Sequence, residues 1–192
     1  NGEQLKFDTM ELKVGDGKSA GNIAVFRNIK TIDGQVIDAI VTTVNTAGVT
    51  INRYDDATVS VDNNFFQLDL RTTAANGSAQ FKFDFIKGGT YDAVTKTGQA
   101  VILQNVALNS YDIDAASSGQ NQFQEFGGFA TYTVSSATVL NQSTLATNFV
   151  HFQDTGNAND GFVAADLVEA TKRAVSDNYR VMALYDAISS FE

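Results

Sequence analysis

The stretch Ala79-Gln-Phe-Lys-Phe-Asp-Phe85 (AQFKFDF) places an aromatic ring at every second position. Successive side chains of a strand point to opposite faces, so Phe81, Phe83 and Phe85 would share one face and the polar residues the other. No helix would gather these three rings on one stripe. The stretch therefore predicts a β-strand with one buried face.

Strands of the same kind are expected along most of the chain. Alternating patterns rich in Val, Ile, Thr, Phe and Tyr mark the segments 22–30, 35–44, 65–70, 99–110, 128–134, 147–153 and 178–187. Between them, glycine-containing clusters supply the positive φ angles of tight turns, at 14–18, 32–35, 75–78 and 87–90. This pattern favours an all-β fold, an antiparallel β-sandwich of the jelly-roll kind.

Residues 162–175 depart from this alternation. Their apolar residues recur at spacings of three and four, and Asp160 could cap the start of a helix. We therefore expect at most one short helix. The length of 192 residues suits one domain with a sizeable core, and we expect residues 1–192 to be a single ligand-binding domain cut from a much longer protein.

The composition excludes several classes of partner. With 22 acidic against 13 basic residues, the formal net charge is −9, which opposes binding to nucleic acid because phosphate backbones attract clustered Lys and Arg. No apolar run is long enough to suggest membrane insertion. Cysteine is absent, so disulfides and thiolate metal sites are excluded. We expect a monomeric module within a long chain.

The first candidate metal site follows the strand predicted at 99–110. Asp112 and Asp114 are two residues apart, so both carboxylates would point to one side, and Glu125 follows a polar loop. Converging carboxylates repel one another unless a cation lies between them, and oxygen ligands are those that Ca²⁺ prefers. The alternative, ordinary solvated loop charges, is equally consistent with these residues.

The second candidate metal site is a run of oxygen-bearing side chains around Gly156. Its members are Asp154, Asn157, Asn159, Asp160 and Asp166. Such a loop could wrap a calcium ion, but Asn and Asp also form turns without any metal. A third cluster of acids, at Asp55, Asp56 and Asp62, is weaker and typical of a solvated hairpin end.

Catalysis receives little support from the sequence. His151 is the one histidine, and no Gly-x-Ser-x-Gly motif accompanies it, so an ordinary strand histidine is favoured over a Ser–His–Asp hydrolase. Phe123, Phe126, Phe129 and Tyr132 flank the acidic loop and could form a sugar platform or a peptide pocket, although core positions are commoner for such rings.

Four stretches carry a resemblance to a known family. They are NIAVFRNIKTIDGQVIDAIVTTV (22–44), VALNSYDIDA (106–115), FQEFGGFATYTV (123–134) and YRVMALYDAISSFE (179–192). Together they resemble the calcium-dependent peptide-binding domain of giant bacterial RTX adhesins, of the Marinomonas ice-binding type and the Vibrio haemagglutinin type. The likeness extends over most of the chain.

This resemblance implies a β-sandwich that carries several calcium ions and lies outside a Gram-negative cell, anchored through the rest of the adhesin. It also implies attachment to host or microalgal surfaces through capture of free peptide C-termini, with calcium assisting. Asp112, Asp114 and Glu125 match its calcium pattern. For the ligand pocket we take residues near the acidic loop, namely Tyr111, Asn121, Phe126 and Tyr132. A carbohydrate-binding module and a purely structural spacer remain as alternatives.

Overall fold

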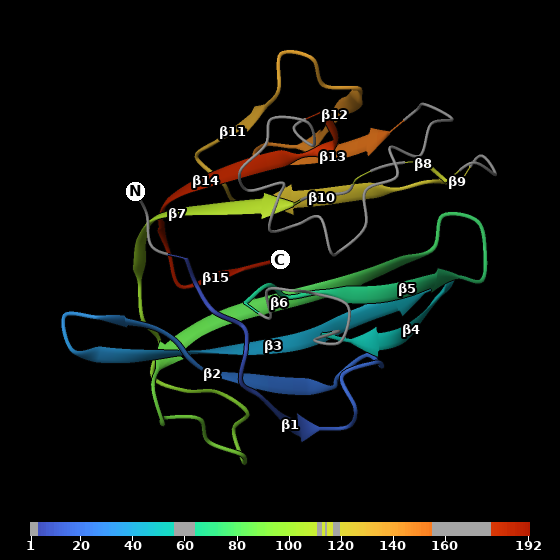
Figure 1. Ribbon diagram of the computed structural model, residues 1–192. Helices are drawn as coiled ribbons and strands as arrows, with labels where there is room; N and C mark the ends of the chain where they lie inside the picture. The colour runs from blue at the N-terminus through green and yellow to red at the C-terminus, as the bar shows by residue number, and fades with distance from the viewer. Residues whose placement is uncertain (1–3, 56–63, 111–112, 114, 117–119, 155–177) are drawn as a thin grey trace. The chain divides into compact units, whose positions relative to one another are not determined.

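The computed structural model describes residues 4–55, 64–110, 113, 115–116, 120–154 and 178–192. The described chain is built from antiparallel strands, as expected (Figure 1). They are β1 (Met10–Val14), β2 (Ile23–Ile32), β3 (Gln35–Ala47), β4 (Val49–Tyr54), β5 (Leu68–Thr72), β6 (Ser78–Lys87), β7 (Leu103–Ser110), β8 (Ala115–Ala116), β9 (Gln120–Asn121), β10 (Phe123–Gly127), β11 (Thr131–Val134), β12 (Leu140–Ala146), β13 (Phe149–Asp154), β14 (Val181–Ile188) and β15 (Ser190–Phe191).

The described residues contain no α-helix, and none of their helical turns is long and apolar enough to cross a membrane. The helix predicted at 162–175 lies outside the described residues. The chain separates into two compact units, one of residues 1–102 and 189–192 and the other of residues 103–188. The expectation of a single domain stays a prediction, and each unit is described by itself.

The first unit is organised around the strand predicted from AQFKFDF. Its main sheet has the order β1-β2-β3-β6-β15. On β6, Phe81, Phe83 and Phe85 lie on one face, opposite alternate residues of β3. Phe85 is buried, and the ring of Phe83 stacks on Phe191 with centroids 4.6 Å apart. The alternating pattern thus predicted both the strand and its buried face.

The β4–β5 hairpin and the residues before β5 cover this aromatic face. The ring of Phe66 contacts Phe83 and Phe81 at centroid distances of 5.3 and 5.7 Å, and it also contacts Tyr54 at the end of β4, at 5.5 Å. Gly17, with φ +82°, lies so close to the Tyr54 ring that no side chain fits there. The turn predicted at 14–18 therefore belongs to the packing of this core.

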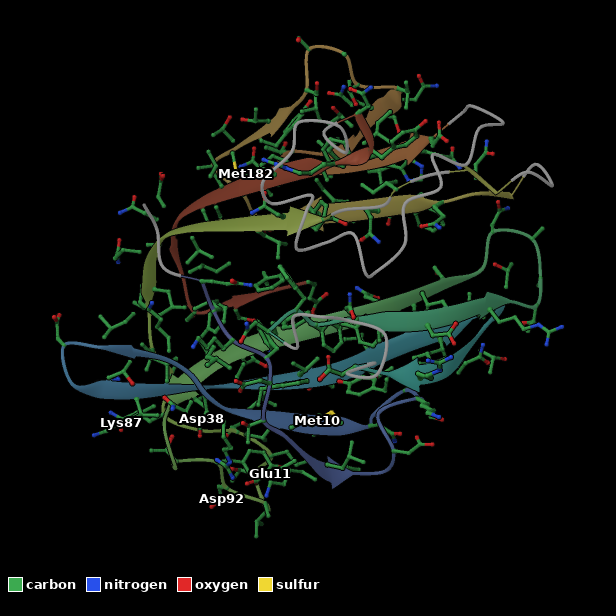
Figure 2. The ribbon with its side chains drawn as sticks, viewed as in Figure 1. Met10, Glu11, Asp38, Lys87, Asp92 and Met182 are labelled. Atoms are coloured by element: carbon green, nitrogen blue, oxygen red, sulfur yellow. The ribbon has the colours of Figure 1, made fainter. Side chains whose placement is uncertain are left out.

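On the other face of the sheet, Arg27 of β2 forms ion pairs with Asp38 of β3 and Glu11 of β1. Asp38 and Glu11 are labelled in Figure 2. Asp38 is 2% exposed and accepts hydrogen bonds from Arg27 Nη1 (2.8 Å), the Asn28 N–H (2.8 Å) and the Gly89 N–H (2.9 Å). Arg27 also binds Glu11 of β1 at 2.9 Å. One carboxylate thus holds the bulge in β2 and the loop after β6 in place.

The second unit is a small sandwich of two three-stranded sheets, ordered β10-β13-β12 and β11-β14-β7. The sheets pack through aromatic side chains. Tyr132 of β11 contacts Phe152 of β13 at 5.1 Å, and the Tyr185 hydroxyl of β14 donates to the Gly127 carbonyl of β10. The inner face of β13 therefore carries Val150 and Phe152, and its alternate residues face outward.

Candidate binding site

The outer face of the β10-β13-β12 sheet carries several polar side chains and the ring of Phe123. The strand registers place Glu125, His151 and Ser143 in one row across the three strands. The next row on the same face is Phe123, Gln153 and Asn141. We call these six residues the histidine face. It includes Glu125 and His151 from the sequence analysis.

His151 is fixed on two sides. Its Nδ1 lies 2.8 Å from Glu125 Oε1, and its ring stacks on Phe123 with centroids 5.1 Å apart and planes 20° apart. The side chain of His151 is 21% exposed and that of Glu125 is 35% exposed. The hydrogen bond and the stacking orient the imidazole, and its other nitrogen makes no hydrogen bond to another described residue.

Ser143, His151 and Glu125 have the residue types of a catalytic triad, in a row that the sequence analysis did not find. A triad requires a hydrogen bond between nucleophile and base and a site for the developing oxyanion. Among the described residues no hydrogen bond joins Ser143 to His151, and Ser143 lies exposed on the sheet. A binding surface fits these side chains better, and the absence of catalysis stays a prediction.

The predicted calcium ligands divide between the two faces of this sheet. Glu125 points outward beside His151, whereas Asp154, at the end of β13, is 1% exposed and lies on the inner side. Their side chains cannot hold the same ion. In the described part of the chain no three His, Asp or Glu side chains cluster as a metal site. The remaining proposed ligands lie outside the described residues: Asp112, Asp114, Asn157, Asn159, Asp160 and Asp166.

Two of the residues assigned to a ligand pocket pack in the interior of the second unit. Phe126 is buried against Phe152, and the Tyr132 hydroxyl donates to Gln142 at 3.1 Å while its ring packs inward. Asn121 is exposed in β9. Tyr111 lies outside the described residues. Phe126 and Tyr132 thus occupy core positions, the alternative weighed for these rings.

Among the strands that the structure describes, β12 is an open edge of its sheet. Within the described residues it pairs only with β13, and every residue from 141 to 146 is exposed. Its sequence, LNQSTLA, has no charge and no proline. Natural sheets protect edges with lysine, proline or bulges, because an open edge presents unpaired N–H and C=O groups to another strand. Most of β12 lacks that protection.

Asp55, the first residue of the weaker acidic cluster, has a structural role. Asp55 has a φ of 54°, and its Oδ1 accepts a hydrogen bond from the Gln67 N–H at 3.3 Å. This bond links the end of β4 to the residues before β5. Asp56 and Asp62 lie outside the described residues.

A hollow of about 180 Å³ lies over β6 in the first unit. Its lining includes Lys82 and Asp84, which form an ion pair at 2.8 Å, and Gly98 of the loop after β6. Ligand pockets usually enclose about 300 Å³ or more. This hollow is smaller and its charges are already paired, so the histidine face and the β12 edge are the better candidates.

Comparisons with known proteins give a structural match only. No protein-family model and no curated protein matches the chain. A solved structure with a similar fold is the N-terminal domain of the Streptococcus gordonii adhesin Sgo0707, with a TM-score of 0.51 and 12% sequence identity. The match covers 96% of this chain and 44% of that chain, so this chain spans less than half the length of the adhesin structure. At this identity the likeness shows the fold alone.

Proposed function

We propose that this protein is a non-enzymatic, calcium-dependent adhesion module that captures the free C-termini of extended peptides. The observation that carries the proposal is the open edge of β12, whose first residue, Leu140, lies opposite Asp154. Two further facts support it. The sequence resembles peptide-binding domains of RTX adhesins, and the similar solved structure is itself an adhesin domain.

The edge of β12 suits strand addition. An extended peptide that pairs with an open edge gains main-chain hydrogen bonds, while its alternate side chains lie along the sheet. The exposed residues of β12 are uncharged, so they repel neither acidic nor basic ligands. Leu145, which is 51% exposed, offers an apolar contact near the far end of the strand.

The direction of β12 explains selection of a C-terminus. β12 runs from Leu140, opposite Asp154, to Ala146, opposite Phe149. A peptide antiparallel to β12 therefore ends beside Leu140, within about 10 Å of Asp154, since neighbouring strands lie about 4.8 Å apart. Its terminal carboxylate then lies near the run of Asp and Asn side chains that begins at Asp154.

A bound calcium ion offsets the electrostatic repulsion of the peptide carboxylate at the Leu140 end of β12. A chain with a net charge of −9 would repel a carboxylate, and a bound calcium ion reverses the local sign while accepting a ligand oxygen in place of water. The buried carboxylate of Asp154 lies at the start of the run of oxygen-bearing side chains that would hold the ion. Several calcium ions, including one at Asp112 and Asp114, belong to this proposal.

The biological setting belongs to the same proposal. The module acts outside the cell, on a bacterial surface, as a monomeric part of a longer RTX-type adhesin. Its partners are peptide or protein C-termini on host or microalgal cells. It binds no nucleic acid and does not insert into membranes.

A peptide-library screen followed by fluorescence polarisation tests this function. One binding peptide is compared with its C-terminally amidated form, each in calcium and in EDTA. We expect only the free acid in calcium to bind well. Equal binding by the amide, or binding that survives EDTA, contradicts the proposal. A peptide N-methylated at alternate residues should also lose affinity, because it cannot pair with β12.

A further inference from the structure

We propose that the histidine face binds neutral saccharides. This second site is independent of the peptide function, because its side chains project from the outer face of the sheet whereas peptide pairing uses the main chain of the β12 edge. The six residues form two rows of three, about 10 Å across the strands and about 7 Å along them. A surface of this extent accommodates one or two sugar rings.

The two rings of the histidine face provide the apolar contact. Phe123 and His151 stack on each other, and the bond from His151 Nδ1 to Glu125 Oε1 fixes the imidazole. Phe123 remains partly exposed, at the edge of the sheet. An aromatic surface held in one orientation binds the C–H face of a pyranose with little loss of side-chain entropy.

The remaining side chains match sugar hydroxyls, which both donate and accept hydrogen bonds. Asn141 and Gln153 each offer a carbonyl oxygen and an NH₂ group, and Ser143 offers a hydroxyl. Glu125 adds a carboxylate acceptor. These groups surround the rings on three neighbouring strands, so several hydroxyls of one sugar can be bound together.

Charge restricts the class of saccharide. In the described residues of the second unit, Arg180 is the sole Lys or Arg, whereas Glu125 lies within the face itself. An acidic sugar would meet the Glu125 carboxylate, and the face contains no Lys or Arg to offset the repulsion. The geometry therefore points to neutral hexoses or N-acetylhexosamines and away from sialic acids and sulfated glycans.

The test begins with the intact protein on an array of neutral and acidic glycans. The best neutral methyl glycoside is then titrated by NMR to about 10 mM, above the ~1 mM dissociation constant expected for a shallow surface site. We expect the ring signals of Phe123 and His151 to shift. The Asn141→Ala/Gln153→Ala double variant should weaken binding about thirtyfold, since two hydrogen bonds of about 1 kcal/mol each are lost and every 1.4 kcal/mol is a factor of about ten.

The matched control is Gln124→Ala, an exposed amide on β10 that points to the opposite face. It should leave sugar binding unchanged. The proposal fails if no neutral glycoside shifts the ring signals, or if the double variant binds with the affinity of the wild type. It also fails if acidic glycans bind as tightly as neutral ones, or if sugar binding requires added Zn²⁺. Peptide binding is measured on Phe123→Ala, whose ring belongs to the histidine face but lies on β10, at the other edge of the sheet from β12, and it should be unchanged, so failure of either site is recognised separately.

Discussion

Replacing Asp38 with alanine should destabilise the first unit strongly. Asp38 is 2% exposed and accepts three hydrogen bonds, two from backbone N–H groups and one from Arg27. Breaking a buried charge pair by removing one partner costs about 3–5 kcal/mol. Arg27 stays partly solvated and keeps Glu11, so we expect about 3 kcal/mol. Asp38→Asn keeps an acceptor and should cost about 1–2 kcal/mol.

Urea unfolding monitored by circular dichroism measures both variants against a control on the same sheet. Asp84→Ala removes the partner of Lys82 in an ion pair at the surface, which should cost less than about 1 kcal/mol. The account is refuted if Asp38→Ala and Asp84→Ala destabilise equally, because burial of the Asp38 carboxylate would then contribute nothing.

The effect of pH on the same variants has a definite sign. Burial raises the pKa of the Asp38 carboxyl, but hydrogen bonds from the Asn28 and Gly89 N–H groups and from Arg27 outweigh it, so the pKa is lowered overall. A depressed carboxyl pKa stabilises the fold above the unfolded value of about 4, and this stability is lost as the pH falls through the folded value. The difference between wild type and Asp38→Asn should therefore shrink below about pH 4. A difference that stays constant from neutral to acid pH contradicts this assignment.

Three further predictions concern calcium and the open edge. Millimolar calcium should raise the melting temperature relative to EDTA. At a calcium concentration one hundred times the dissociation constant, binding adds about 2.7 kcal/mol to the free energy of unfolding. Equal melting curves in calcium, magnesium and EDTA would contradict a role for calcium. Calorimetry should count fewer calcium ions in the Asp112→Ala/Asp114→Ala variant and an unchanged number in Asp186→Ala. Asp55→Ala is a poor control for the calcium count, although Asp55 belongs to the weakest acidic cluster. Asp55 has a φ of 54° and accepts a hydrogen bond from the Gln67 N–H, so its replacement would also disturb the fold. Leu145→Lys should weaken binding of a basic peptide through charge repulsion at the far end of β12, while Val94→Lys, at a residue 91% exposed in the first unit, should leave binding unchanged.

The alternation of rings with polar residues predicted β6. Phe81, Phe83 and Phe85 face the aromatic core, whereas Lys82 and Asp84 form an ion pair on the opposite face. β12 was not predicted, because its side chains beyond Leu140 are all exposed and so show no alternation of apolar and polar residues. The strand expected at 99–110 begins at Leu103. Residues 99–102 instead form a few isolated backbone hydrogen bonds with the end of β6.

The histidine face could not be derived from spacing along the chain. Glu125 and His151 are 26 residues apart, and only the register of β10 against β13 places them side by side. The same register places Glu125 and Asp154, which the sequence had assigned to two different candidate metal sites, on opposite faces of the sheet. The Asp38–Arg27 pair did leave a signal, a carboxylate within the apolar run VIDAIV, which requires a buried partner.

Paramagnetic relaxation measured with a spin-labelled peptide tests the central claim most directly. A binding peptide carries the label beside its C-terminus in one sample and at its N-terminus in another, and the amide signals of β12 are compared. The account predicts that the C-terminal label broadens signals near Leu140 and Asp154, whereas the N-terminal label broadens those near Leu145 and Ala146. The reverse pattern, or no broadening of β12 by either label, would contradict capture of a peptide C-terminus along this edge.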